Sequence, residues 1–96
     1  MIKHIVMWTL KEENKEANAK EMVKRLTALK TKIDVVVTLE AGIDITKSER
    51  SFDIALYSEF KSVEDLDKYR VHEAHLEAVK FIRSISDKVV AVDYEV

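Results

Sequence analysis

The first ten residues alternate between two phases, and both phases are largely apolar. One phase includes Trp8, whereas the other includes Ile5 and Met7. Such a segment is typical of a strand with both faces covered, so the pattern predicts a strand over residues 1–10. His4 falls in the phase of Trp8, and the period of two residues therefore places these two side chains on the same face.

The rest of the chain divides into segments with a period of two or of 3.6 residues. A long helix should follow the first strand, with acidic residues near its start and lysines near its end, as the helix dipole favours. Gly42, the only glycine, ends the second strand where a bend or β-bulge is expected, and Ser62 is a suitable N-cap for the next helix. The expected ranges are 11–32 for the first helix, 34–43, 51–60 and 88–96 for strands, 44–50 for a polar loop, 62–69 for the second helix and 72–85 for its continuation or a further helix.

The resulting order is β-α-β-β-α-β, which predicts an α+β, ferredoxin-like subunit with an antiparallel four-stranded sheet and its helices on one face. The helices cover only one face of the sheet, yet Ile5 and Met7 point to the other. Asp53 and Glu59 are polar positions in the third strand, so an open, solvated sheet is one alternative. The preferred interpretation is a homodimer in which two sheets pack together and form a dimeric α/β barrel.

Composition limits the possible classes of protein. The 96 residues, 47% hydrophobic and 35% charged, are expected to form a single domain over residues 1–96. No cysteine is present, which excludes disulfides, thiolate metal sites and cysteine nucleophiles. The net charge of −2 comes without a basic stripe, so nucleic acid is not an expected partner. No apolar run is long enough for a membrane span and no signal-peptide core begins the chain, so we expect a cytoplasmic protein.

The candidate chemistry is concentrated in the run from Leu66 to Leu76. Tyr69, His72 and His75 follow one another at intervals of three residues, which places them on neighbouring positions of one face if the run is helical throughout. An aromatic hydroxyl and two imidazoles on one surface can bind a polar group inside an apolar pocket, or move a proton. His4 should face the helices and approach Tyr69 or His75 from the sheet.

Each of these residues also has a purely structural interpretation. His4 can bond a backbone carbonyl and pack against a helix, and Tyr69 can be a core aromatic residue whose hydroxyl is satisfied. His72 can simply begin a helix. Trp8 can belong to the core or form one wall of a pocket.

A metal site is the other arrangement to consider. His72 and His75 lie three residues apart with Glu73 between them, but this spacing permits rather than selects the three protein ligands of a catalytic zinc site. The motifs of serine nucleophiles, phosphate-binding loops and calcium loops are missing. We therefore expect no metal and no cofactor.

Five segments together resemble the stress-responsive α/β-barrel domain family (Dabb), and they run in register over nearly the whole chain. They are the opening residues 1–6, the turn at Gly42, residues 51–60, the Tyr69-x-x-His72-x-x-His75 run and the closing residues 92–95. The resemblance implies a ferredoxin-like subunit and a dimeric barrel. Most family members have no assigned reaction. In a few plant polyketide cyclases of the family, a tyrosine and a histidine placed like Tyr69 and His75 carry out an aldol-type ring closure.

The chain departs from the pattern of these relatives at three positions. Glu73 stands where the family usually has proline, although an acid is also favourable at the first position of a helix. Ile54 and Leu26 stand where the cyclases have a histidine and a tyrosine. Both changes make the expected cavity more apolar.

Two functional classes follow, and a third alternative has no pocket. The first is a binding module that holds a small, mainly apolar or aromatic molecule between helices and sheet, with His4, Trp8 and His72 as ligand-binding residues. The second is a cyclase- or isomerase-type enzyme that acts on an enolisable carbonyl compound. In that enzyme His75 would take a C–H proton as general base and Tyr69 would donate to the enolate oxygen. The third is a structural stress protein with a filled core.

Overall fold

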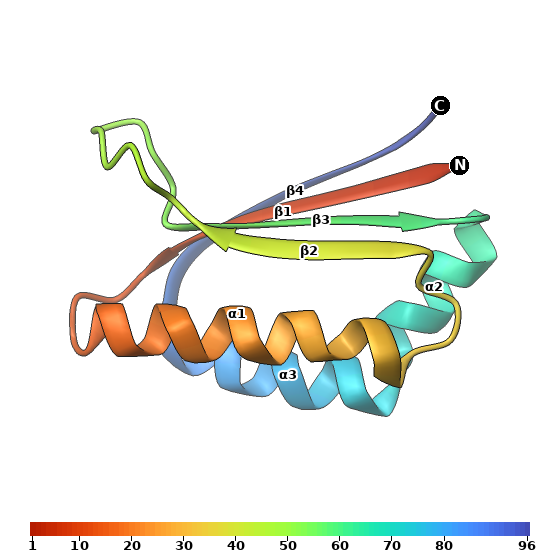
Figure 1. Cartoon of the computed structure of the whole chain (residues 1–96), viewed down its shortest axis with the longest axis horizontal. Helices are drawn as coiled ribbons and strands as arrows, with labels where there is room; N and C mark the ends of the chain where they lie inside the picture. Colours follow the sequence, from red (N-terminus) through yellow and green to blue (C-terminus); the bar gives the residue numbers. More distant parts are fainter.

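The computed structural model describes residues 1–96 and has two layers, a sheet and a group of helices that covers one of its faces (Figure 1). The two chain ends lie side by side, and the amino group of Met1 donates to the carbonyl of Val96 at 3.1 Å. The elements in chain order are β1 (Ile2–Leu10), α1 (Lys15–Lys32), β2 (Thr38–Ile43), β3 (Ile54–Phe60), α2 (Val63–Val71), α3 (Glu73–Ile85) and β4 (Ser86–Glu95). None of the helices is long and apolar enough to cross a membrane.

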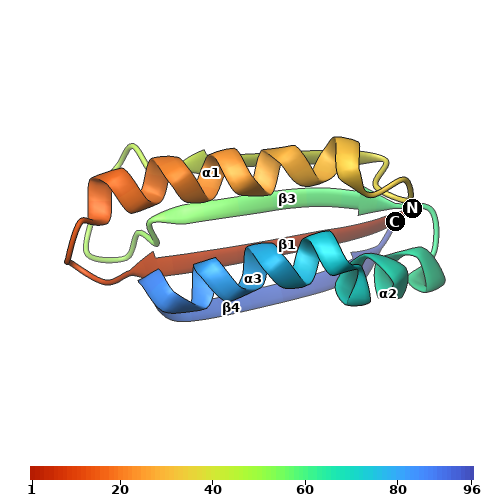
Figure 2. The same cartoon turned by 90° about the horizontal axis from the view of Figure 1, so that it is seen from below.

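The strand order is β2-β3-β1-β4, and every neighbouring pair is antiparallel. Figure 2 shows α1 alongside β2 and β3, whereas α3 lies over β1 and β4. This is the predicted ferredoxin-like arrangement, with the second helical region divided into α2 and α3. The fold class that the hydrophobic pattern predicts is therefore confirmed.

The two faces of β1 differ as its alternating sequence predicts. His4 and Trp8 are buried and face the helices. On the opposite face Met7 is 38% exposed and Ile5 is half-buried. The predicted approach of His4 to Tyr69 is also confirmed, because their ring centroids lie 6.1 Å apart.

Three elements, α1, β2 and β3, begin later than the sequence pattern predicts. α1 begins at Lys15 rather than at residue 11, because Asn14 has a left-handed backbone conformation with φ of 53°. β2 begins at Thr38 rather than at residue 34. The preceding segment forms a turn, in which the Val36 N–H donates to the carbonyl of Ile33 at 3.2 Å.

β3 begins at Ile54 because Asp53 holds the end of β1 instead of extending the strand. The Asp53 N–H donates to the carbonyl of Trp8 at 2.8 Å, and its carboxylate accepts the Leu10 N–H at 2.7 Å. The sheet is irregular at this end, where the register of β1 against β4 shifts between Thr9 and Leu10.

The bend or bulge predicted at Gly42 is wrong. Gly42 pairs regularly with Ala55 inside the ladder of β2 and β3. Its φ is not positive, so its backbone does not need the freedom of glycine. A Cβ built at this position would meet no atom within 4 Å.

Candidate functional site

A hollow of about 400 Å³ lies between the inner face of β1 and β4 and the helices α2 and α3. Ten of its fifteen lining residues are hydrophobic. The lining includes four of the five candidate residues from the sequence, namely His4, Trp8, Tyr69 and His75. The fold therefore brings His4 and Trp8 of the first strand together with Tyr69 and His75 of the helices.

Tyr69, on α2, is completely buried at one side of this hollow. Its ring lies against Phe60 and His75, with centroid distances of 5.0 and 4.5 Å. Its hydroxyl has no hydrogen-bond partner, so the interpretation as a satisfied core hydroxyl is wrong. Burial raises the pKa of Tyr69 to about 12, and the hydroxyl therefore keeps its proton at neutral pH and can donate to a ligand.

His75 lies in the first turns of α3 with its imidazole oriented by the backbone. Its Nδ1 is 2.9 Å from the carbonyl oxygen of Arg70. A carbonyl oxygen only accepts, so Nδ1 carries the hydrogen and Nε2 has the free lone pair. Burial is the main cause that lowers the pKa of His75 below its usual value, which favours the neutral ring at neutral pH.

His4 belongs to a hydrogen-bonded cluster with residues from two other elements. Its Nδ1 lies 2.5 Å from Oδ1 of Asp93 on β4, and Oδ2 of Asp93 accepts from Nη2 of Arg70 at 2.5 Å. Arg70 also donates to Asp67 at 3.3 Å. Thus His4 bonds a carboxylate rather than the backbone carbonyl considered from the sequence, and Asp93 fixes the orientation of its ring.

Sequence reasoning missed Asp93 and Arg70. The signal for Asp93 is the pairing of the first and last strands, which places it directly opposite His4. Because paired residues project to the same face of a sheet, an acid opposite an inward histidine indicates contact between the two side chains. Arg70 gives no comparable signal, since a charged residue beside Tyr69 is equally typical of an exposed helix face.

His72 is the one candidate that the structure keeps out of the hollow. It has an extended backbone conformation (φ −64°, ψ 138°) that ends α2 and begins α3. Its Nδ1 accepts the N–H of Ala74 at 3.0 Å, as an N-cap. Of the two alternatives for this region, the further helix is therefore confirmed, because α2 ends and α3 begins on either side of His72.

The Stress responsive A/B Barrel Domain family (Dabb) matches residues 2–96. The chain belongs to this family. It is 30% identical over 98 residues to the stress-response A/B barrel domain-containing protein DABB1 of Arabidopsis thaliana, covering 98% of this chain and 46% of that protein. The chain thus spans less than half the length of this relative.

Two further proteins are similar over nearly their whole length. Olivetolic acid cyclase of Cannabis sativa is 28% identical over 95 residues, which cover 97% of this chain and 94% of that enzyme. A crystal structure from Bacteroides fragilis, described as a dimeric protein of unknown function with a ferredoxin-like fold, superimposes with a TM-score of 0.90. It is 32% identical, and the match covers 99% of this chain and 95% of that one.

The two positions that depart from the cyclase pattern lie differently with respect to the hollow. Leu26 on α1 contributes to its wall, whereas Ile54 is 1% exposed within the core and does not line it. Leu26 therefore adds apolar surface to the hollow. No group of three or more histidine, aspartate or glutamate residues is placed to hold a metal ion.

Proposed function

We propose that this chain binds a small, mainly apolar or aromatic molecule in the hollow beside Tyr69 and His75, and that it does so as a homodimer. The observation that carries this proposal is the buried hydroxyl of Tyr69, which has no partner in the chain and belongs to a residue that lines a hollow of about 400 Å³. An unpaired buried donor costs stability, about 1–3 kcal/mol, unless a ligand oxygen accepts its hydrogen.

The lining supports an apolar or aromatic ligand. Small-molecule sites are typically concave, of roughly 300–1,000 Å³, and mainly apolar with a few placed polar groups. Leu56, Ile82 and Val79 supply apolar surface, and Trp8 supplies an aromatic one. The polar groups of His75 and Tyr69 lie together, which suits a ligand with one oxygen-bearing end.

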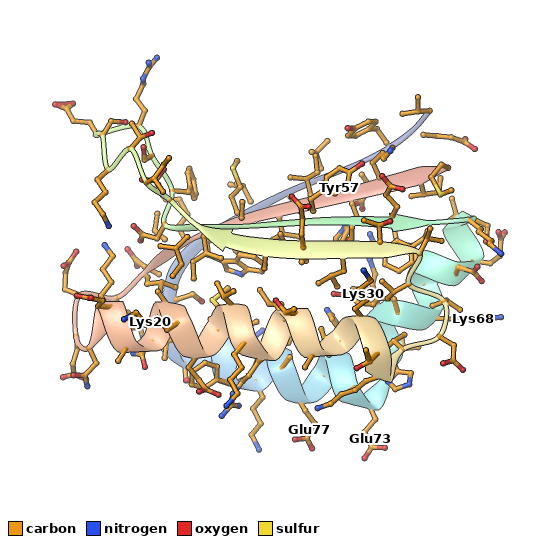
Figure 3. The ribbon with its side chains drawn as sticks, viewed as in Figure 1. Lys20, Lys30, Tyr57, Lys68, Glu73 and Glu77 are labelled. Carbon is orange, nitrogen blue, oxygen red and sulfur yellow. The ribbon has the colours of Figure 1, made fainter.

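The outer face of the sheet supports pairing with a second copy. Val90 and Val92 are 40% and 53% exposed there and pair with Met7 and Ile5 of β1. Figure 3 shows Tyr57 on the side of the sheet away from the helices, where its hydroxyl accepts from Lys3 at 2.8 Å. An apolar centre with a satisfied polar group beside it is typical of an interface, and the similar Bacteroides fragilis protein is dimeric.

Sedimentation tests the dimer, and the expected particle has twice the 11.1 kDa mass of the subunit. Val92→Asp should place a charge in the interface and give monomers. Val71→Asp is the matched control, because Val71 is 72% exposed at the end of α2 and should leave the dimer intact. A monomeric wild-type protein would contradict this part of the proposal.

Two measurements test ligand binding. A native mass measurement of the purified protein identifies any molecule that is retained. Titration with N-phenyl-1-naphthylamine, a neutral aromatic probe, measures the capacity of the hollow directly. Val79→Phe adds bulk to its lining and should weaken probe binding at least about tenfold, whereas Val71→Phe should not. Equal binding by wild type and Val79→Phe would contradict the proposed site.

An enzyme that acts on an enolisable carbonyl compound is the second candidate, favoured by the orientation of His75. With its hydrogen on Nδ1, the ring can accept a proton from a substrate C–H bond at Nε2. The electron pair of that bond then forms the enolate, whose oxygen accepts the hydrogen of the Tyr69 hydroxyl. Exchange of the methyl protons of an aryl methyl ketone for deuterium tests this step. We expect wild type to accelerate exchange above the rate in buffer, and His75→Gln to lose this acceleration. Exchange at the buffer rate with wild type would contradict the enzymatic function and would not affect the proposal of ligand binding.

A further inference from the structure

The two permanently charged side chains in the lining of the hollow, Arg70 and Arg83, are both cationic. Five ionisable side chains line it, namely His4, Tyr69, Arg70, His75 and Arg83, and no aspartate or glutamate is among the lining residues. The acids nearest in sequence on α3 point elsewhere, since Glu73 and Glu77 project away from the sheet (Figure 3). Asp93 does not line the hollow but pairs with Arg70, so Arg83 is the unpaired cation of the lining that favours an anionic ligand.

The two arginines of the lining differ in their partners. Arg70 is committed to Asp93 and Asp67, with nitrogen–oxygen distances of 2.5 and 3.3 Å. Arg83 forms no ion pair and no side-chain hydrogen bond, and it is exposed at the edge of the hollow. Its guanidinium group is therefore the cation that can receive an anionic group without breaking an existing pair.

Helix electrostatics explain only part of this arrangement. Arg83 lies in the last turn of α3, where a cation is favourable for the helix dipole. That effect requires a positive charge near the helix end, but it does not require the side chain to line a hollow. The planar guanidinium, which can bind a carboxylate through two parallel hydrogen bonds, suits an anion site better than a role in helix stability alone.

The position of Arg83 also defines the length of the site. It follows His75 by eight residues, which is about 12 Å along a helix axis. Leu76, Val79 and Ile82 line the hollow between these two positions. The polar end at Tyr69 and His75 and the cation at Arg83 are thus separated by an apolar stretch.

We propose that Arg83 forms an anion subsite, and that the ligand is an elongated aromatic or apolar monoanion, such as a carboxylic acid. The carbon frame of this ligand occupies the apolar stretch and its anionic group pairs with Arg83. This inference rests on the proposed binding function and specifies its ligand class.

Two fluorescent probes with the same aromatic frame test the subsite. 8-Anilino-1-naphthalenesulfonate carries an anionic group, and N-phenyl-1-naphthylamine is the same frame without it. The variants are Arg83→Gln and Arg83→Lys, with Arg50→Gln as the control that removes one positive charge from the distant 44–53 loop. Arg83→Gln should weaken sulfonate binding about tenfold, as expected for loss of a charge-assisted contact, and leave the neutral probe within about twofold. Arg83→Lys should give an intermediate loss, and Arg50→Gln should change neither affinity.

The outcomes separate the anion subsite from the proposed function. Equal loss of both probes in Arg83→Gln, or no loss of either, would overturn the subsite while binding of the neutral probe still supports the hollow as a site. Equal effects of Arg83→Gln and Arg50→Gln would likewise overturn it, because they would reflect net charge alone. Failure of both probes to bind wild type, or full binding of the neutral probe by Val79→Phe, would overturn the proposed function and the subsite with it.

Discussion

The layer between the sheet and the helices has two halves of different character. Under α1, Met22, Leu29 and Ile33 are nearly or completely buried and pack as an aliphatic core with Ile54 of β3. Under α2 and α3, the same layer contains His4, Tyr69 and His75 around a hollow. Well-packed aliphatic contacts stabilise a fold, whereas unpaired donors and voids lower its stability. The comparison indicates that the α1 half supports the fold and that the α2/α3 half carries the site.

The sharpest test of this difference is the deletion of one leucine from each half. Leu29→Ala, at a position 2% exposed, should lower the free energy of unfolding by about 3 kcal/mol through lost burial and a cavity. It should leave the affinity for the neutral naphthylamine probe nearly unchanged. Urea denaturation and probe titration measure the two quantities.

Leu76→Ala is the matched substitution on the other half. Leu76 is 55% exposed and lines the hollow, so its loss should cost less than about 1 kcal/mol of stability and should weaken probe binding. If Leu29→Ala and Leu76→Ala had the same ratio of lost stability to lost probe affinity, the two halves would not differ in function.

A second contrast lies inside the histidine run. His75→Ala should weaken ligand binding about tenfold, and it should lower stability by about 1 kcal/mol because the bond to the Arg70 carbonyl is lost. His72→Ala should lower stability by a similar amount, about 1 kcal/mol, through loss of the N-cap bond to Ala74, but should leave binding unchanged. Weaker ligand binding by His72→Ala would show that His72 contributes to the site.

The comparison also explains what the sequence could predict. Strand phase follows from a period of two residues, so the inward direction of His4 and Trp8 could be predicted. Helical spacing likewise predicted that Tyr69 and His75 lie near one another, as they do, although they stand on α2 and α3 rather than on one helix. Both arguments use local periodicity, which survives into the folded chain wherever an element is regular.

The misplaced features depend on interactions between distant segments or on a break in regularity. A further helix from residue 72 was one of the two sequence alternatives, but nothing in the hydrophobic period indicated the extended backbone of His72 that separates α2 from α3. The contact between His4 and Asp93 requires the pairing of the first and last strands. The late start of β3 depends on bonds between Asp53 and β1. A pattern read along the chain contains none of these contacts.

A smaller effect should appear in the pH dependence of stability. Burial lowers the pKa of folded His75 below the ordinary 6.5 that the unfolded chain retains. As pH falls through 6.5, His75 of the unfolded state binds a proton before His75 of the folded state does. The free energy of unfolding therefore has its full value, as far as His75 is concerned, above that pH, and it falls progressively until the pH reaches the folded pKa. Denaturation at a series of pH values should show this decline in wild type and in His72→Gln. In His75→Gln the part of this decline that comes from His75 should be absent. If the pH profile of His75→Gln were the same as that of wild type, burial of His75 would not be a cause of the decline.

The smallest expected change, and the only one of opposite sign, concerns the hydroxyl of Tyr69. Tyr69→Phe keeps the ring contacts with Phe60 and His75 and removes only an oxygen that has no partner. Removing an unsatisfied buried group should leave the free energy of unfolding unchanged or raise it by up to about 1 kcal/mol. Ligand affinity should fall, because the donor to the ligand oxygen is lost. Tyr57→Phe is the control, since the Tyr57 hydroxyl is bonded to Lys3 and Glu59 on the outer face and its loss should lower stability without changing binding. A clear destabilisation by Tyr69→Phe with unchanged affinity would mean that the α2/α3 half, like the α1 half, serves only as core.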